Sequence, residues 1–141
     1  MQLKDLFAPE DLVLGLEASD KWAAIARLME HLAERGKIPA GRLDELLEQV
    51  VARERSMSTG MEHGIAIPHA AVSDGDMDSV AACLGIVGSE GGLEFESIDA
   101  RPTQVIVLLL IPRSQKLVHI RTLADIARVL GKQQVREDLR T

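Results

Sequence analysis

The spacing of apolar residues in the first half of the chain predicts two helices. Across residues 19–36 apolar side chains recur at the helical period, Ser19 or Asp20 can cap the start, and Gly36 can close the end. Residues 39–55 show a second apolar stripe of the same period, formed by Leu43, Leu46, Leu47, Val50 and Val51. The connection between the two segments is short, so we expect the helices to be close neighbours.

After Ser56 the pattern indicates strands. Residues 64–67 form a short apolar run, and residues 79–88 alternate between a face of larger side chains and a face of small ones that would let a helix pack closely. Residues 93–96 alternate apolar side chains with glutamates, which predicts a half-exposed strand. Residues 105–111, VIVLLLI, are apolar on both faces, which is typical of a central strand covered on both sides.

The last part of the chain predicts two further helices. Ser114 can cap the first of them, which ends before Gly131, and residues 132–140 would form a short second one. The apolar stripe of the first consists of Leu117, Ile120, Leu123, Ala127 and Leu130. Helices on both sides of a central strand indicate an α/β three-layer sandwich, and strands without helical crossovers between them indicate a mixed sheet. No repeat or linker divides the chain, so we expect one domain spanning residues 1–141.

Composition and charge narrow the possible partners. Only 2% of the residues are aromatic and the formal net charge is −6, which argues against a nucleic-acid partner. The N-terminal residues do not form a signal peptide, and no apolar run approaches the ~18 residues of a spanning helix. We therefore expect a cytoplasmic protein with no direct membrane insertion. Cys83 lies inside an apolar run and is interpreted as a core residue, and we expect no cofactor.

Residues 62–74, EHGIAIPHAAVSD, place a histidine directly after a proline at the end of an apolar run. Ile67 precedes the proline and is biased to extended geometry. Pro68 has no N–H, so strand pairing is expected to stop there. His69 would then project from a stiff strand end, a suitable support for a reactive side chain. On this segment alone, a hydrogen-bonded histidine in an ordinary loop is the simpler interpretation.

A longer stretch gives His69 a more specific interpretation. Residues 53–70, RERSMSTGMEHGIAIPHA, resemble the type-2 enzyme IIA proteins of the bacterial phosphoenolpyruvate-dependent sugar phosphotransferase system. This group includes the fructose- and mannitol-specific domains and the nitrogen-regulatory IIA proteins. The matched features are the Arg53-Glu54 pair, the Ser58-Thr59-Gly60 turn and the GIAIPH run. Downstream, residues 93–112 look like the family's paired strands and residues 119–130 like the helix with its second histidine.

The resemblance implies a phosphoryl carrier. The histidine matching His69 would accept a phosphoryl group from the phosphocarrier protein HPr, then pass it to a IIB domain or hold it as a regulatory signal. A neutral imidazole is nucleophilic near neutral pH, and phosphoryl transfer mainly requires in-line positioning and positive charge around the oxygens. The residues that would stabilise the phosphate are Arg53, Ser58, Thr59 and His119.

Each of these four residues also has a structural interpretation. Arg53 can be a solvated arginine at a helix end, and Ser58 and Thr59 can belong to a turn. His119 can be an ordinary helix-surface histidine. As a neutral imidazole beside His69, it could instead fix the tautomer of that ring or donate to the phosphate.

The chain departs from the family at Met61-Glu62-His63, where related proteins often carry Gly-Asn-Gly. A rival hypothesis from this departure is a metal hydrolase in which His63, His69 and His119 bind the ion. A closer alternative is a regulatory module that acts on a kinase, transporter or transcription factor. His31 is interpreted as surface or packing. Sugar specificity is not expected to reside in this chain.

Acidic residues around the predicted site could meet a basic rim on the phosphoryl donor, although such residues are more often plain solubilising side chains. These residues are Glu54, Glu62, Asp74, Asp76 and Asp78.

Overall fold

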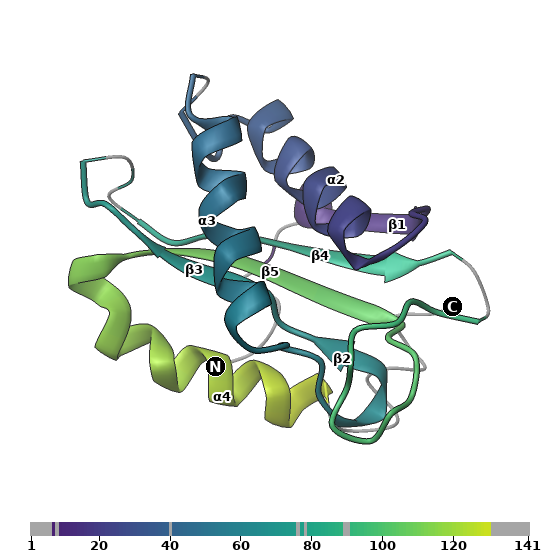
Figure 1. Cartoon of the computed structure of the whole chain (residues 1–141). Helices are drawn as coiled ribbons and strands as arrows, with labels where there is room; N and C mark the ends of the chain where they lie inside the picture. The colour runs from purple at the N-terminus through teal and green to yellow at the C-terminus, as the bar shows by residue number, and fades with distance from the viewer. Residues whose placement is uncertain are drawn as a thin grey trace.

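The computed structural model describes residues 7, 9–39, 41–75, 77, 79–88 and 91–130, apart from the side chains of residues 118–120. Within these residues a five-stranded sheet lies between helices (Figure 1). The helices are α2 (Lys21–Glu34), α3 (Leu43–Ser56) and α4 (Lys116–Leu130). The strands are β1 (Leu12–Leu16), β2 (Ile65–Ala66), β3 (His69–Val72), β4 (Ala81–Val87) and β5 (Val105–Pro112). Short 3-10 turns span Pro9–Asp11, Glu62–Gly64 and Arg113–Gln115.

The sheet is mixed and separates two helical layers, which confirms the predicted three-layer α/β sandwich. The strand order is β1-β4-β5-β2, and β3 continues beside β5. Only the β4–β5 pair is antiparallel, while β1 runs parallel to β4, and both β2 and β3 run parallel to β5. Helices α2 and α3 cover one face and α4 lies against the other (Figure 1).

Helix α2 follows the predicted caps. The side chain of Asp20 accepts a hydrogen bond from the Ala23 N–H at 2.8 Å. Gly36, with a φ of +70°, donates its N–H to the Ala33 carbonyl after the helix ends. Helix α3 is also confirmed, although it begins at Leu43 and not at residue 39.

Strand β4 carries the two predicted faces. Its larger side chains pack in the core cluster on the α4 side, and its small ones face α2. A Cβ added at Gly85 would lie 3.0 Å from methyl carbons of Leu16 and Leu28, so the missing side chain lets α2 approach the sheet. Strand β5 is buried along its whole length, as expected for a central strand.

Residues 93–96 do not form the predicted strand. Leu93 makes one isolated bridge with Thr103, and Glu96 has a φ of +53° that breaks extended pairing. The alternation of burial is nonetheless present, since Leu93 and Phe95 are buried and the two glutamates are exposed. The alternation in sequence therefore predicts which side chains face the core, but it does not predict whether the backbone forms hydrogen bonds to a neighbouring strand.

The beginning and the end of the chain bring further differences. Strand β1 was not predicted. Ser114 lies in a 3-10 turn, where its N–H donates to Asp74 at 3.1 Å, and does not cap α4. Leu117 is 84% exposed, so it does not belong to the apolar stripe of α4, whereas Ile126 does. The helix predicted at 132–140 lies outside the described residues.

Strand pairing does not stop at Pro68, contrary to the sequence-based expectation. Ala66 lies opposite Ile106 and His69 opposite Leu109, so the register beside β5 is the same before and after the proline. The carbonyl of Pro68 still accepts a hydrogen bond from the Leu109 N–H at 3.1 Å. The proline removes one donor without moving the chain away, and His69 is the first residue of the resumed strand.

Candidate functional site

His69 is held by its own strand in one tautomer. Its Nδ1 lies 2.8 Å from the carbonyl oxygen of Ile67, which can only accept, so Nδ1 carries the proton. The ring is partly buried, and alternation along the strand places it on the same sheet face as Ile65 and Ile67. The lone pair of Nε2 is therefore the nucleophilic position of this ring.

The surroundings keep this imidazole neutral. Burial is the main cause that lowers the pKa of His69 below 6.5, and the charges of Arg53 and Lys116 lower it further. The hydrogen bond to Ile67 and the charge of Glu54 act in the opposite direction without reversing the shift. Because only a neutral ring has a free lone pair, the site favours the nucleophilic form at pH 7.

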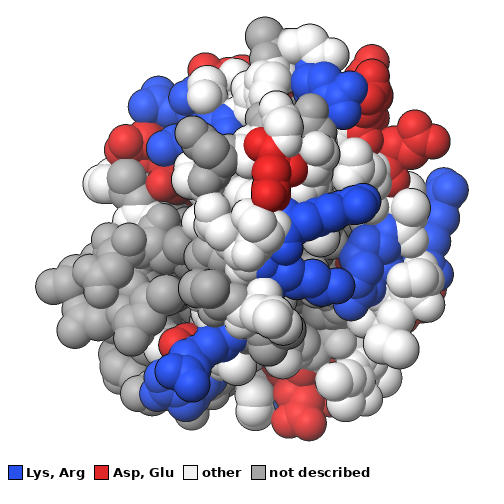
Figure 2. Space-filling view, turned by 90° about the vertical axis from the view of Figure 1, so that its left-hand side faces the viewer, with Lys and Arg blue, Asp and Glu red and all other residues white. Residues whose placement is uncertain are grey.

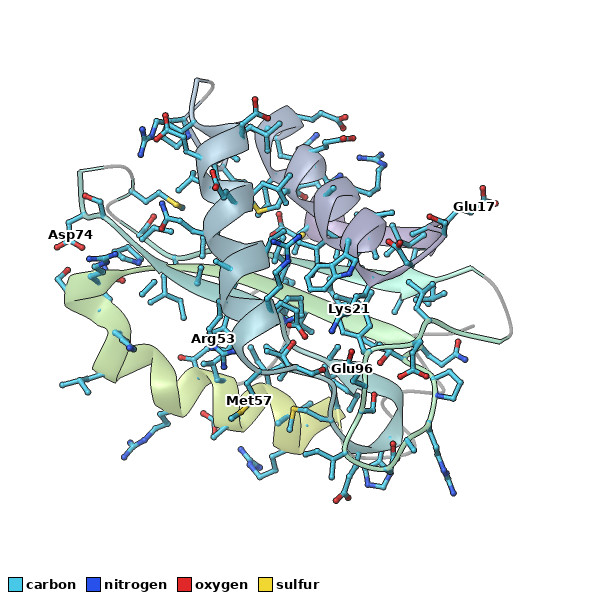
Figure 3. All side chains as sticks on the ribbon, viewed as in Figure 1. Glu17, Lys21, Arg53, Met57, Asp74 and Glu96 are labelled. Atoms are coloured by element: carbon cyan, nitrogen blue, oxygen red, sulfur yellow. The ribbon has the colours of Figure 1, made fainter. Side chains whose placement is uncertain are left out.

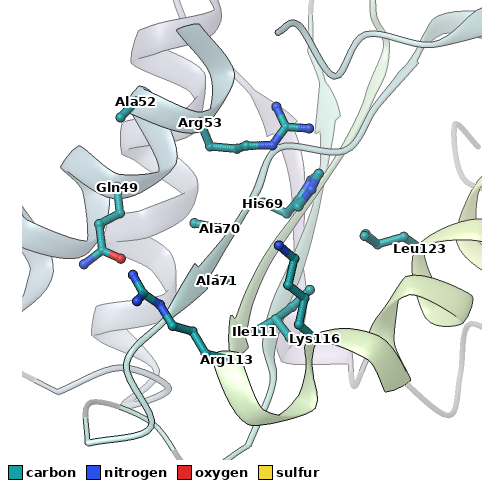
Figure 4. A pocket seen from close by; sticks show the side chains of 10 residues that line it. All are labelled: Gln49, Ala52, Arg53, His69, Ala70, Ala71, Ile111, Arg113, Lys116 and Leu123. Atoms are coloured by element: carbon teal, nitrogen blue, oxygen red, sulfur yellow. The ribbon is translucent and has the colours of Figure 1, made fainter. Parts of the chain in front are cut away.

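A cavity of about 370 Å³ opens beside the ring and is bordered by three cations, Arg53, Arg113 and Lys116. Figure 4 shows Arg53 on one side of the imidazole and the ammonium of Lys116 directed toward it from the other. Basic side chains also gather near the middle of the face that bears the turn between β5 and α4 (Figure 2). Positive charge beside a neutral nucleophile suits an incoming anion.

Arg53 reaches the site from the last turn of α3. One guanidinium N–H donates to the Met57 carbonyl at 3.0 Å, which ties the side chain to the end of its own helix. A cation at a helix C-terminus is also favoured by the helix dipole. Arg53 borders the basic cavity, so the structure brings Arg53 and His69 to the same cavity.

Next to this basic cavity lies a second, mostly apolar one of about 520 Å³, and both include Arg53 and His69. Its apolar border comprises Met57, Met61, Ile67, Ile98, Leu123, Ala124 and Ala127. Met57 and Ile98 are 71% and 74% exposed. An apolar surface therefore adjoins the His69 ring, which is the kind of surface that a protein partner covers. The sequence alone could not locate it.

Behind Arg53, its neighbour Glu54 belongs to a buried ionic network. Glu54 is 2% exposed and Lys21 is 7% exposed, and the Lys21 Nζ lies 3.3 Å from Glu54 Oε2. The Lys21 ammonium also lies 4.8 Å from the centre of the Trp22 ring. Figure 3 shows Lys21 on the α2 side of α3 and Arg53 on the other side. The network joins α2 to the end of α3, the helix end that carries Arg53.

The hydroxyls of Ser58 and Thr59 form hydrogen bonds to other residues of the protein. The Thr59 N–H and hydroxyl donate to the two carboxylate oxygens of Glu54 at 2.8 and 2.6 Å. The Ser58 hydroxyl donates to the Phe95 carbonyl and accepts from the Gly60 N–H at 3.1 Å. Both residues border the apolar cavity, but their hydroxyl donors are occupied. This arrangement does not support the prediction that these hydroxyls donate to phosphoryl oxygens; here they hold the loop between α3 and β2.

His119 lies in the first part of α4, but its side chain is outside the described residues. The tautomer of His69, for which His119 was one candidate partner, is set by the Ile67 carbonyl. His63 is on a 3-10 turn with a φ of +67° and borders a different cavity from that of His69. On α2, the Nε2 atom of His31 lies 2.7 Å from the carbonyl oxygen of Glu10.

Of the acidic residues that the sequence suggested as a rim around the site, Glu62 and Asp74 are exposed. Glu54 is buried and cannot face a partner, and Asp76 and Asp78 lie outside the described residues. The cations Arg113 and Lys116 were not predicted. Their signal in the sequence was two basic residues just after the central strand, at the edge where parallel β3 also ends.

Among the residues that the structure describes, no helix combines the length and apolarity needed to cross a bilayer. Within the same residues, no three His, Cys, Asp or Glu side chains are grouped so that they could hold a metal ion.

Known proteins match this chain along nearly its whole length. The nitrogen regulatory protein of Bradyrhizobium diazoefficiens is 30% identical over 141 residues, which cover 99% of this chain and 87% of that protein. Nitrogen regulatory protein IIA-Ntr from Neisseria meningitidis has the same fold, with a TM-score of 0.83 and 23% identity over 99% of this chain and 90% of the other.

The mannitol enzyme IIA of Escherichia coli, solved in complex with phosphorylated enzyme IIB, also has this fold. Its TM-score is 0.77 at 19% identity, over 96% of this chain and 88% of the other. The family model described as "Phosphoenolpyruvate-dependent sugar phosphotransferase system, EIIA 2" matches residues 5–141. Proteins of this family serve as phosphoryl carriers or as nitrogen regulatory proteins. The chain belongs to the EIIA 2 family of the phosphoenolpyruvate-dependent sugar phosphotransferase system, which confirms the predicted resemblance.

Proposed function

We propose that His69 is the phosphoryl acceptor of this chain and that Nε2 is the attacking atom. The observation that carries this proposal is the hydrogen bond between Nδ1 and Ile67, which leaves the Nε2 lone pair free beside a basic cavity. A carboxylate next to that lone pair would repel a phosphoryl group, and no carboxylate borders the basic cavity among the described residues.

The transfer step balances without a base. The Nε2 lone pair of His69 forms the bond to phosphorus while the bond between phosphorus and the donor nitrogen of phospho-HPr breaks, and that nitrogen keeps the electron pair. The proton on Nδ1 stays in place, where the Ile67 carbonyl stabilises the positive charge that the phosphorylated ring acquires. The reverse sequence at a IIB domain passes the group on.

In this mechanism Arg53 neutralises the equatorial oxygens of the phosphoryl group. Its planar guanidinium offers several N–H donors, of which one is used by Met57. Ser58 and Thr59 support the loop below the ring. Should they bind phosphate directly, they must first release Phe95 and Glu54.

For the role of the phosphoryl group, we favour regulation over sugar transport. The support is that a relative aligned over 87% of its own length is named a nitrogen regulatory protein. The target would be a kinase, transporter or transcription factor that distinguishes the two states of His69. A transport relay to a IIB domain is the second candidate, because a mannitol IIA of the same fold is complexed with phosphorylated IIB.

The proposed acceptor is tested by incubating the protein with labelled phosphoenolpyruvate, enzyme I and HPr. We expect one acid-labile, base-stable phosphate on wild type, a two-dimensional NMR signal of Nε2-phosphohistidine, and no label on His69→Gln. His31→Gln is the matched control and should be labelled like wild type. Equal labelling of His69→Gln, or a phosphate on Nδ1, would refute the proposed chemistry.

The two candidate roles separate in a second experiment. Phosphorylated protein is mixed with a cognate IIB domain, and transfer is followed by loss of label. Rapid transfer supports the transport relay. A stable complex with a cell protein whose affinity changes on phosphorylation, without transfer to IIB, supports regulation.

A further inference from the structure

Two cations next to His69 lack a structural explanation. Arg113 lies in the 3-10 turn after β5 and Lys116 is the first residue of α4. Both side chains are exposed and border the basic cavity. In the part of the chain that the structure describes, neither forms an ion pair with a carboxylate, whereas Arg128, further along the same helix, pairs with Asp125 at 3.3 Å.

The position of Lys116 is unfavourable for the helix itself. Helix N-termini prefer acidic residues because the helix dipole is positive there, yet the first turn of α4 has none. A lysine at this point adds positive charge to a positive end. A residue that opposes local stability in this way is expected where it serves a site.

Lys116 also acts on the ring electrostatically. Its ammonium points toward the imidazole in Figure 4, and its charge is one of the causes that lower the pKa of His69. Arg113 borders the same cavity from the side of Gln49 and Ala71. Together with Arg53, these side chains place positive charge on the α3 side and on the α4 side of the nucleophile.

We propose that Lys116 contacts the phosphoryl oxygens on phosphorylated His69, with Arg113 as a second neutralising charge, so that the phosphate lies between α3 and the turn after β5. This inference rests on the proposed function of His69. It assigns part of the phosphate contacts to residues after the central strand, and the ammonium donates to the oxygens that Arg53 does not reach.

The test measures the pKa of the phosphoryl group on His69. The whole chain is phosphorylated on His69, either through HPr or with potassium phosphoramidate, which needs no protein partner. The phosphorus NMR shift is then titrated with pH in wild type, Lys116→Gln, Arg113→Gln and Lys116→Arg. Arg121→Gln is the matched control, since Arg121 is an exposed arginine of α4 that does not border the cavity.

A nearby cation favours the dianionic phosphate, so removing it raises the phosphoryl pKa. We expect Lys116→Gln to raise it by about 0.5 to 1 unit, less than the roughly 1–3 units seen for a carboxyl beside an arginine, because Lys116 is exposed. Arg113→Gln should cause a smaller rise, and Lys116→Arg should restore the wild-type value. Arg121→Gln should titrate as wild type.

The outcomes distinguish this inference from the proposed function. If wild type is not phosphorylated on His69 by either route, the proposed function fails. If wild type is phosphorylated but Lys116→Gln and Arg121→Gln titrate alike, only the contact by Lys116 is refuted. Slower transfer from HPr to Lys116→Gln with an unchanged phosphoryl pKa would likewise overturn it, because Lys116 would then act on the partner.

Discussion

Arg53 and Glu54 are adjacent in the chain but belong to two regions with opposite electrostatic character. Glu54 lies in a buried network in which every charge that the structure describes has a partner, namely Lys21 and the two donors of Thr59. Arg53 lies in the open region around His69, where three cations border the basic cavity and no described carboxylate does, although Glu96 borders the adjoining apolar cavity. One helix position separates a buried structural charge from one that borders the cavity beside His69.

The contrast between the buried network and the basic cavity indicates how charges near a site should be interpreted. A buried ion whose hydrogen bonds are satisfied within the protein has nothing left to offer a ligand, and its loss leaves its partner unpaired in a dry place. A partly exposed cation without a carboxylate can still gain a partner, and an incoming phosphoryl group supplies one. Changes in the buried network should therefore alter stability, whereas changes in the basic cavity should alter transfer.

The largest expected effect lies in the buried network. Glu54→Ala leaves Lys21 buried without its carboxylate, so we expect a loss of about 3–5 kcal/mol in the free energy of unfolding. Urea denaturation measures it. Glu48→Ala is the matched control, because Glu48 is exposed on the same helix and should cost no more than about 0.5 kcal/mol. Similar losses in both variants would show that the network does not hold α2 to α3.

The second effect should appear in transfer alone. Arg53→Gln removes a donor from the developing negative charge, so we expect phosphorylation of His69 to slow by roughly 100- to 1,000-fold. Quenched-flow kinetics with phospho-HPr measure the rate. The control is Arg55→Gln, one helix position beyond Glu54. Urea denaturation should show little change, since Arg53 borders a cavity. A variant as unstable as Glu54→Ala would remove the distinction between the two regions.

A smaller effect sharpens the role of Thr59. Thr59→Val keeps the shape of the side chain and removes the hydroxyl that donates to Glu54 at 2.6 Å. Hydrogen bonds to charged groups contribute about 1.5–3 kcal/mol, and we expect a stability loss in that range. The transfer rate under conditions where the variant stays folded should remain close to wild type. A large fall in that rate would restore Thr59 as a phosphate ligand.

The smallest effect concerns pH. Because the pKa of folded His69 lies below 6.5, the unfolded chain takes up a proton at this residue first as the pH falls. The stabilisation from neutral His69 is present above pH 6.5 and is lost as the pH falls through the folded pKa. NMR of the ring protons gives the folded pKa, and His69→Gln should lose stability less steeply with acid. A ring pKa above 6.5 would contradict the assignment.

The charged residues that shift the pKa of His69 also predict whether that pKa rises or falls in variants. Arg53 and Lys116 oppose protonation and Glu54 favours it. Lys116→Gln should therefore raise the pKa of His69, and Arg121→Gln should leave it unchanged.

Much of the fold could be predicted because buried side chains recur along the chain at the spacing of a helix or of a strand. The stripes of α2 and α3, the two faces of β4 and the continuous apolar run of β5 each follow from residues that face a core. Residues 93–96 show the limit of this argument, since they alternate in burial without pairing. Periodicity reports which side chains are buried, but hydrogen bonds between strands depend on backbone neighbours from elsewhere in the chain.

The site divides in the same way. The motif around His69 and its resemblance to a known family identified the histidine and Arg53 from residues close together in sequence. Arg113 and Lys116 come from more than forty positions away and border the same cavity as the ring only because β3 and β5 are paired in parallel. The hydroxyls of Ser58 and Thr59 lie near the site in sequence, yet packing turned them toward Phe95 and Glu54.

From the sequence alone we could predict most helices and strands, the central strand and the histidine that we propose as the phosphoryl acceptor. These depend on side-chain period and on local backbone constraints, which short segments carry by themselves. The folded structure was needed to establish which nitrogen of His69 is free and which charges are buried or open. The free nitrogen follows from a hydrogen bond to Ile67, two residues earlier, which forms once folding fixes the strand. The charges depend on distances between residues far apart in the chain and on exposure to water, which exists only after folding.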